Sequence, residues 1–436
     1  MQFRKGMVRG VFAFTLLLGV AAGAMIFNSS VELTEAGVHK RLLLPLGPLG
    51  KAAIPLYAGT GDHPVLPGHL DGPVVRHDAG GNWSATWFCE DRVVRRRGNG
   101  PELSLDCAGK HLRYPLQAMP AAAPSEFDMP SKLVVLSDIE GNFTFLDAAL
   151  RELDVADADG NWRFGANRLV ILGDAVDRGR DVFAVLWRLY ALDQQARAAG
   201  GAVHLLLGNH EQYLLRGNTS RANSDHLYAL DQIGGQQQAF AADTVLGRWL
   251  RQQPVIMRTG RVLLTHGGIS PEVAASGLPV PALNQAMADY WRGQEAPPAA
   301  LEAVLGPAGL TQYRGYFEDG GERYRKATSA EVAKALRAFD ADLVVVGHTL
   351  VERVSLLHDD HVYAVDVNTG EAASEALLFD EGVPRVVALK TRRFESDGRQ
   401  ARRNTRRLDL LAAGDRDMLE RSILRSFELY RLPHPY

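Results

Sequence analysis

The sequence predicts an α/β protein built on a mixed β-sheet, and two observations support this. Five short apolar runs are rich in branched residues and are each bounded by glycine or a carboxylate, a pattern typical of buried strands. Between residues 131 and 210 such runs alternate with helical patterns, whereas the last third of the chain has strands joined by short polar turns, as in a meander. The five runs are Leu133–Leu136, Leu169–Leu172, Val203–Leu207, Val262–Leu264 and Leu343–Val346.

Residues 1–27 form an N-terminal apolar segment. Arg4, Lys5 and Arg9 precede an uncharged stretch over 11–27, which is typical of a signal anchor or a signal peptide. The stretch just reaches the length of about 17 residues needed to span a bilayer. A small-x-small cleavage site lies at 22–24, but the apolar run continues past it. We expect the basic end to stay in the cytoplasm and the rest to be inner-membrane anchored with a periplasmic catalytic domain, or exported to the periplasm.

Residues 28–118 are expected to form a small β-rich accessory module, followed by a proline- and alanine-rich linker over 119–130. The chain has two cysteines, Cys89 and Cys107, and both lie in this module. In an oxidising compartment such a pair is expected to form a structural disulfide. A redox or metal-binding pair is the alternative, but the sequence has no C-x-x-C motif to support it.

The main domain is expected over residues 131–393, with helices over 143–153 and 181–199. Its later strands are expected at 344–346, 354–357, 362–367, 376–379 and 386–389. Residues 394–436 form an arginine-rich tail with an amphipathic stretch over 408–432, which predicts a helix packed on the domain.

Polar motifs follow the apolar runs, at the carboxyl ends of the predicted strands. Side chains from distant parts of an α/β chain gather at this edge of the sheet. His266 and His348 each follow a buried strand, which favours a ligand role over that of an ordinary core histidine. The motifs are Asp138-Ile139-Glu140-Gly141-Asn142, Gly173-Asp174-Ala175-Val176-Asp177-Arg178-Gly179, Gly208-Asn209-His210-Glu211, Thr265-His266-Gly267-Gly268 and Gly347-His348-Thr349.

These five motifs, in this order, resemble the calcineurin-like metallophosphoesterase superfamily. Their residues are similar to the motifs of the phosphoprotein-phosphatase branch, including its Shewanella-like phosphatase and diadenosine-tetraphosphatase relatives. The resemblance covers residues 131 to about 370. It implies a four-layer α-β-β-α sandwich with two mixed sheets and a dinuclear metal centre at one edge.

The resemblance also implies a ligand set for two divalent metal ions. Asp174 would bridge the ions, Asp138 and Glu140 would hold the first, and Asn209, His266 and His348 would hold the second. Two such ions about 3.5–4 Å apart supply a hydroxide at neutral pH and neutralise phosphoryl charge. The mixed oxygen and nitrogen donors suit Mn, Fe, Zn, Co or Mg, and the abundance of oxygen favours Mn or Mg, with Mn expected first.

Glu140 departs from the family pattern, which usually has histidine at this position. The exchange replaces a neutral ligand by an anion, so we expect tighter capture of hard cations and a weaker attraction for a phosphate dianion. A catalytically silent phosphate-binding module is therefore one alternative function.

By the family's logic, His210 would protonate the leaving oxygen while Asp177 orients its ring. Arg178 would bind phosphate oxygens through a bidentate fork. A second arginine is commonly needed, and Arg314, between tyrosine and glycine, is the candidate. A surface-loop arginine is the alternative for this position.

The sequence thus predicts a metal-dependent phosphatase that hydrolyses phosphomonoesters by in-line attack of a metal-bridging hydroxide. The expected partner is a phosphorylated small molecule or phosphoprotein, together with a membrane through the N-terminal segment. A formal net charge of -3 gives no reason to expect nucleic acid. A phosphodiesterase or pyrophosphohydrolase acting on nucleotides is the other alternative.

Overall fold

The computed structural model describes residues 19–34, 40–56, 65–117, 124–367, 374–392 and 403–432. The chain folds into two compact units: one holds residues up to Pro67 and from Asp397 to Leu432, and the other begins at Gly68 and extends to Ser396. Residues 11–18 of the apolar stretch lie outside the described residues, and 19–27 are helical. No helix in the described ranges combines the length and apolar character needed to cross a membrane.

The first unit is built from both ends of the sequence. Its four-stranded sheet has the order β20-β1-β2-β3, and β1 pairs antiparallel with both β2 and β20. A small core, which includes Val31, Leu42 and Met418, packs α12 on this sheet. The tail helix thus lies where an amphipathic pattern predicted a helix, but the expected packing on the main domain is wrong, since the helix belongs to the first unit and packs on its sheet. The elements are β1 (Ser30–Thr34), β2 (Lys40–Pro45), η1 (Gly47–Leu49), β3 (Lys51–Leu56), β20 (Arg403–Arg407) and α12 (Ala413–Arg431).

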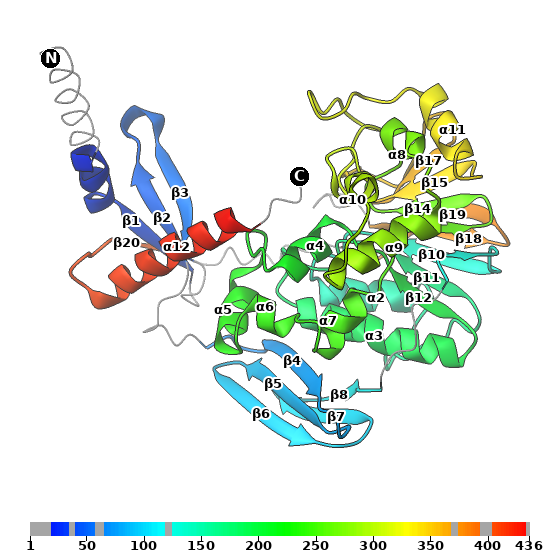
Figure 1. Cartoon of the computed structure of the whole chain (residues 1–436). Helices are drawn as coiled ribbons and strands as arrows, with labels where there is room; N and C mark the ends of the chain where they lie inside the picture. Colours follow the sequence, from blue (N-terminus) through cyan, green and yellow to red (C-terminus); the bar gives the residue numbers. More distant parts are fainter. Residues whose placement is uncertain are drawn as a thin grey trace, which may run out of the picture. The chain divides into compact units, whose positions relative to one another are not determined.

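The second unit is a mixed α/β fold with several sheets (Figure 1). Its five-stranded sheet has the order β12-β11-β10-β18-β19, in which the first three strands are parallel and the last two are antiparallel to their neighbours. Helices α2 and α3 make the crossovers between the parallel strands, as the alternating pattern predicts. The elements are β10 (Lys132–Leu136), α2 (Phe143–Glu152), β11 (Arg168–Ile171), α3 (Val182–Ala198), β12 (Ala202–Leu205), β18 (Glu375–Asp380) and β19 (Val383–Ala388).

A six-stranded mixed sheet has the order β16-β17-β15-β14-β13-β9. The late strands, expected to follow one another in a meander, are divided between the two sheets. β15 and β17 pair in parallel here, while β18 and β19 join the five-stranded sheet. The short turns between these strands did not predict this division, because the spacing of strands along the sequence does not determine which sheet each strand joins. The elements are β9 (Glu126–Phe127), β13 (Ile256–Thr259), β14 (Val262–Thr265), β15 (Leu343–Val346), β16 (Ser355–Leu357) and β17 (Val362–Ala364).

Apolar clusters show what each sheet packs against. One cluster combines residues of both large sheets, such as Val135 and Val170 with Leu264 and Val345, so the sheets share a core. Two further clusters pack helices on residues of each sheet. The remaining helices are α4 (Asn209–Arg216), α5 (Ser224–Gln232), α6 (Gln236–Ala239), α7 (Val245–Leu250), α8 (Pro271–Ala275), α9 (Val280–Trp291), α10 (Pro298–Leu305) and α11 (Ser329–Arg337).

The small sheets over residues 70–115 belong to the second unit, so the predicted 28–118 module is divided between the two units. Within this unit β4 packs against α3, α5 and α7. A disulfide between Cys89 and Cys107 connects the three-stranded sheet to the two-stranded one. The strands are β4 (Leu70–His77), β5 (Trp83–Cys89), β6 (Arg92–Gly98), β7 (Glu102–Cys107) and β8 (Lys110–Pro115).

Candidate metal centre and active site

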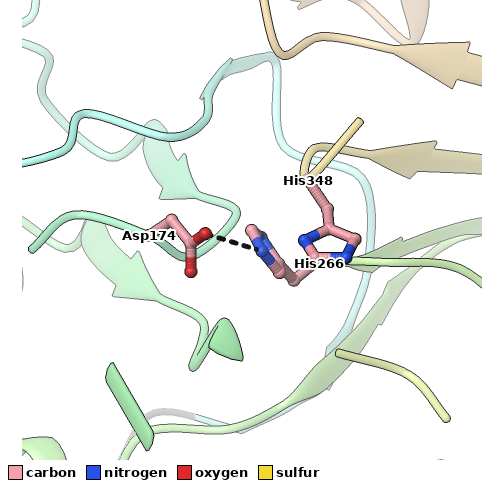
Figure 2. A group of neighbouring side chains, drawn as sticks. All are labelled: Asp174, His266 and His348. Carbon is pink, nitrogen blue, oxygen red and sulfur yellow. Dashed lines mark ion pairs between the residues drawn. The ribbon is translucent and has the colours of Figure 1, made fainter. Parts of the chain in front are cut away.

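Three buried side chains converge from loops that follow β11, β14 and β15. Figure 2 shows Asp174, His266 and His348 turned toward one another. One potential ligand atom from each lies within 4.8 Å of the others, and Asp174 Oδ2 is 3.1 Å from His266 Nε2. This trio is the only such group of three or more histidine, cysteine or acidic residues in the described ranges. The carboxyl ends of strands from both sheets thus supply one site, as the motif positions predicted.

Hydrogen bonds orient both histidines for metal ligation. His266 Nδ1 lies 2.6 Å from Leu172 O, so it donates its proton there and leaves Nε2 toward Asp174. His348 Nε2 lies 3.2 Å from Gln312 O, so it donates its proton there and leaves Nδ1 as an acceptor, 3.5 Å from Arg314 Nη2. Such outer partners fix the tautomer of ligating histidines. The donor set and its buried position therefore fit a divalent metal ion, with one carboxylate and two imidazoles as potential ligands.

Asp138, Glu140 and Asn209 lie around this trio. Asn209 Oδ1 is 3.1 Å from His266 Nε2, beside the Asp174 carboxylate. Asp138 Oδ2 accepts a hydrogen bond from the backbone N–H of His348 at 3.1 Å and another from the hydroxyl of Ser137. Glu140 Oε1 is instead 2.7 Å from Arg178 Nη1, and the Glu140 side chain is only 5% exposed.

Backbone contacts hold the first two motif loops together. Asp138 N–H donates to Gly173 O at 3.0 Å, and Glu140 N–H donates to Asp174 O at 2.8 Å. Gly179 N–H then donates to Glu140 O at 2.8 Å. A Cβ at Gly179 would lie 2.4 Å from Glu140 O and 2.5 Å from Gly141 O. Cβ atoms in proteins essentially never come within 3.0 Å of such an atom. Glycine at 179 is thus required by close approach of two backbones.

The loops contain an unusual number of left-handed residues that are not glycine. Asp138, Glu140, Asp174, Asp177, Arg178 and His348 all have φ between 50° and 67°. Each such residue costs roughly 1–3 kcal/mol and persists only where its surroundings hold it. Strain of this kind concentrates at functional sites, so the backbone independently marks the same loops as the motifs.

His210 and Asp177 form a buried dyad next to the trio. His210 Nδ1 lies 3.0 Å from Asp177 Oδ2, and its Nε2 lies 3.7 Å from Asp174 Oδ2. Burial lowers the pKa of His210, but the carboxylates of Asp174 and Asp177 outweigh it and raise that pKa to about 9. The dyad therefore presents a protonated imidazole whose orientation is fixed by Asp177.

The charged groups of the trio shift one another's pKa. Burial raises the pKa of Asp174, but His210 and His266 outweigh it and hold that pKa far below its usual range. Burial lowers the pKa of His266, yet Asp174 raises it to about 10. For His348, burial and then the charges of His266 and Arg314 lower the pKa well below its usual value. The site keeps an anionic carboxylate and a neutral imidazole in a buried position.

Arg178 and Arg314 border the site from different loops. Arg178 is half exposed and pairs with Glu140. Arg314 Nη1 donates to Thr349 Oγ1 at 3.3 Å, and its Nη2 lies 3.5 Å from His348 Nδ1. Arg314 therefore lies beside His348, a candidate metal ligand.

Glu211 had no assigned role, although it closes the Gly-Asn-His-Glu motif. Its buried carboxylate accepts the backbone N–H groups of Asp174 at 2.9 Å, Ala175 at 2.7 Å and Gly208 at 2.8 Å. It thereby joins the Asp174 loop to the start of α4. Burial and the Asp174 charge raise the pKa of Glu211 to about 7. Its place three residues after a helix N-cap glycine was the available signal.

Comparison with known proteins gives a family for this arrangement. Residues 131–352 match the calcineurin-like phosphoesterase family. A solved structure of a cold-active protein-tyrosine phosphatase from a psychrophilic Shewanella species is 33% identical, with a TM-score of 0.65. That match covers 74% of this chain and 100% of the Shewanella chain.

Two relatives known by sequence match shorter segments. Shewanella-like protein phosphatase 2 of Arabidopsis thaliana is 30% identical over 94 residues, which is 22% of this chain and 24% of that protein. A symmetrical bis(5'-nucleosyl)-tetraphosphatase of a Janthinobacterium species is 28% identical over 141 residues, which is 32% of this chain and 45% of that protein. The chain thus spans less than half the length of these two relatives.

Proposed function

Because this chain belongs to the calcineurin-like phosphoesterase family and is a phosphoric ester hydrolase, we propose that it hydrolyses phosphomonoesters at a dinuclear metal centre. The observation that carries the proposal is the geometry around Asp174. Two histidines with fixed tautomers face this carboxylate, and the protonated His210 stands beside it.

The side chains divide the work of hydrolysis. Water attacks phosphorus in line with the ester oxygen, the new O–P bond forms as the old P–O bond breaks, and His210 gives its Nε2 proton to the leaving oxygen. Asp177 holds the imidazole through Nδ1 and stabilises its protonated form. Arg178 and Arg314 neutralise phosphate oxygens from two sides.

The metal ligands proposed are Asp174 as the bridge, Asp138 and Glu140 for one ion, and Asn209, His266 and His348 for the other. When bound, two divalent ions supply a nucleophile at neutral pH and neutralise phosphoryl charge. Manganese is the proposed metal, since carboxylate and amide oxygens outnumber imidazole nitrogens in this set.

The test is hydrolysis of p-nitrophenyl phosphate by the chain starting after Phe27, with manganese added or chelated. We expect the wild type and an Asp106→Asn control to release nitrophenol only with metal, and Asp174→Asn to release none. Asp106 is an exposed residue of β7, so it serves as a matched aspartate substitution. Absence of turnover in a wild type shown to contain metal would leave a phosphate-binding module as the function and would refute the enzymatic proposal.

A nucleotide pyrophosphohydrolase is the second candidate, favoured by the similarity to a bis(5'-nucleosyl)-tetraphosphatase. Two further substrates distinguish it: the diester bis-p-nitrophenyl phosphate, followed by nitrophenol release, and a dinucleoside tetraphosphate, followed by chromatography of the nucleotide products. A kcat/KM for either that exceeds the value for the monoester would favour this second function.

We also propose the family's four-layer arrangement for the second unit, supported by the core shared between its two large sheets and by the helix clusters on each. For localisation we propose export through the N-terminal segment, supported by the basic and apolar pattern of residues 1–27 and by the Cys89–Cys107 disulfide. Fractionation of cells after osmotic shock, with and without membrane extraction, separates the anchored form from the released form.

A further inference from the structure

A second buried polar cluster lies outside the proposed metal centre, between β4 and α5. Asp71 Oδ2 is 2.6 Å from His226 Nδ1 and 3.9 Å from His69 Nε2, and all three side chains are at most 1% exposed. Four of their polar atoms have no hydrogen-bond partner within the described ranges: both ring nitrogens of His69, Asp71 Oδ1 and His226 Nε2. Buried polar groups without hydrogen-bond partners destabilise the fold, so we expect this cluster to have a function.

The cluster is not arranged as a metal site. His226 already shares a proton with Asp71, and the three side chains do not bring their ligand atoms together as Asp174, His266 and His348 do. Burial lowers the pKa of His69 to about 4, so this ring stays neutral beside the carboxylate. The short contact in the cluster is the Asp71–His226 pair, which joins β4 to helix α5. We call the β4-β5-β6 sheet the accessory sheet.

Residues just before α5 form hydrogen bonds with both the backbone N–H and the backbone carbonyl of Arg178. Asn223, the N-cap of α5, donates from Nδ2 to Arg178 O at 3.0 Å while its Oδ1 accepts from Asp225 N–H at 2.9 Å. Arg178 N–H donates to Arg221 O at 3.0 Å. Asp225 also faces Arg180 at 3.4 Å. Residues 221–225 thus hold the loop that carries Arg178.

Arg178 needs this support because its backbone is left-handed, with φ of 53°, and follows Asp177 with φ of 67°. A conformation that costs roughly 1–3 kcal/mol per residue persists only where neighbours over-determine it. The two hydrogen bonds from residues 221–225 supply that restraint. These hydrogen bonds can restrain the Arg178 backbone only if helix α5 is itself held in place.

We propose that Asp71 and His226 are positioning residues for Arg178: the pair fixes α5 on the accessory sheet, and α5 fixes the phosphate-facing arginine. This inference rests on the proposed function of Arg178 and adds to it a role for the β4–β6 sheet. It predicts that a change at Asp71, on a different sheet from the metal ligands, alters substrate use through Arg178.

The first experiment is a double-mutant cycle on the full chain with p-nitrophenyl phosphate. We expect Asp71→Ala to lower kcat/KM about tenfold in the wild type but less than about twofold when Arg178 is already alanine, because coupled residues are not additive. The Asp106→Asn control removes the negative charge from an exposed Asp–His pair with a 2.8 Å contact in the neighbouring sheet, and we expect no change. Equal losses in both backgrounds would show general structural damage and overturn the inference.

Asn223→Asp tests the same path without disturbing the buried cluster. The aspartate keeps the N-cap acceptor for Asp225 N–H but cannot donate to Arg178 O. We expect a similar loss of kcat/KM, mainly through a higher KM, with unchanged metal content. Unchanged kinetics in this variant would contradict the proposed path.

Hydrogen exchange measured by mass spectrometry keeps the inference testable without activity. Asp71→Ala should speed amide exchange in a peptide spanning 176–181, where Arg178 N–H is bonded, and leave β14 unchanged. An inactive wild type would refute the proposed function alone, whereas unchanged exchange over 176–181 would refute the positioning role whatever the activity.

Discussion

Replacing Gly179 by alanine should separate the two loops that carry the proposed metal ligands Asp138, Glu140 and Asp174. The added Cβ would lie 2.4 Å from Glu140 O and 2.5 Å from Gly141 O. A carbon–oxygen contact is comfortable at about 3.3 Å, so the backbones must part by roughly 0.9 Å. Both neighbours are main-chain atoms, which cannot rotate away as a flexible side chain would.

A displacement of about 1 Å in a catalytic site costs on the order of a hundredfold in rate. We therefore expect Gly179→Ala to lower kcat for p-nitrophenyl phosphate about a hundredfold. The assay compares it with Gly414→Ala, where a Cβ meets nothing within 4 Å. Tryptophan fluorescence during chemical unfolding shows whether the unit is intact, because all six tryptophans lie between residues 83 and 291. A folded Gly179→Ala variant that retains more than half of the wild-type kcat would refute the reasoning.

Three further predictions follow from other contacts. Glu140→His removes one negative charge and the partner of Arg178, so inorganic phosphate should inhibit at lower concentration while manganese binds more weakly; calorimetry with each ion checks both, and unchanged constants would contradict the charge argument. His204, whose pKa is lowered to about 3 by burial and by Arg168, binds a proton more readily when unfolded, so stability should fall as pH drops below about 6.5, by about 2 kcal/mol at pH 5. Chemical unfolding from pH 7 to 4.5 should show a shallower decline for His204→Gln, and an identical slope would remove His204 as a cause. Deleting residues 403–432 removes the β20 partner of β1 and the core residue Met418, so the first unit should lose its circular dichroism signal while the tryptophan-reported unfolding of the second stays unchanged; a shifted tryptophan transition would contradict this.

The sequence predicted that Asp174, His266 and His348 lie close together, because strand ends are local features. The apolar runs before Asp174, His266 and His348 correspond to β11, β14 and β15, and the carboxyl ends of these strands meet at one place. The partners that orient the ligands were not predictable in the same way. The carbonyl oxygens of Leu172 and Gln312 bind the two histidines, and a backbone carbonyl has no sequence signature.

Long-range pairing limited the prediction of the fold. Both β10 and β18 were expected as strands, but the sequence did not predict that they pair, because β18 comes from the far end of the domain. The pairing of Asp71 with His226 likewise joins segments with no common motif. The N-terminal β-rich region was expected to be one module, but its strands enter sheets in two units, since an alternating pattern identifies a strand without identifying its neighbour.

The pairing of β1 with β20 has a consequence for the order in which the chain folds. A ribosome makes β1 before residues 68–396 of the second unit and β20 only after them. Domains generally fold during synthesis from the N-terminal side, but here one edge of β1 must wait, unpaired, until the last strand emerges. An exposed strand edge is a template for wrong association. Residues 68–396 can therefore fold before the first unit, whose sheet is complete only after residue 407 has been made.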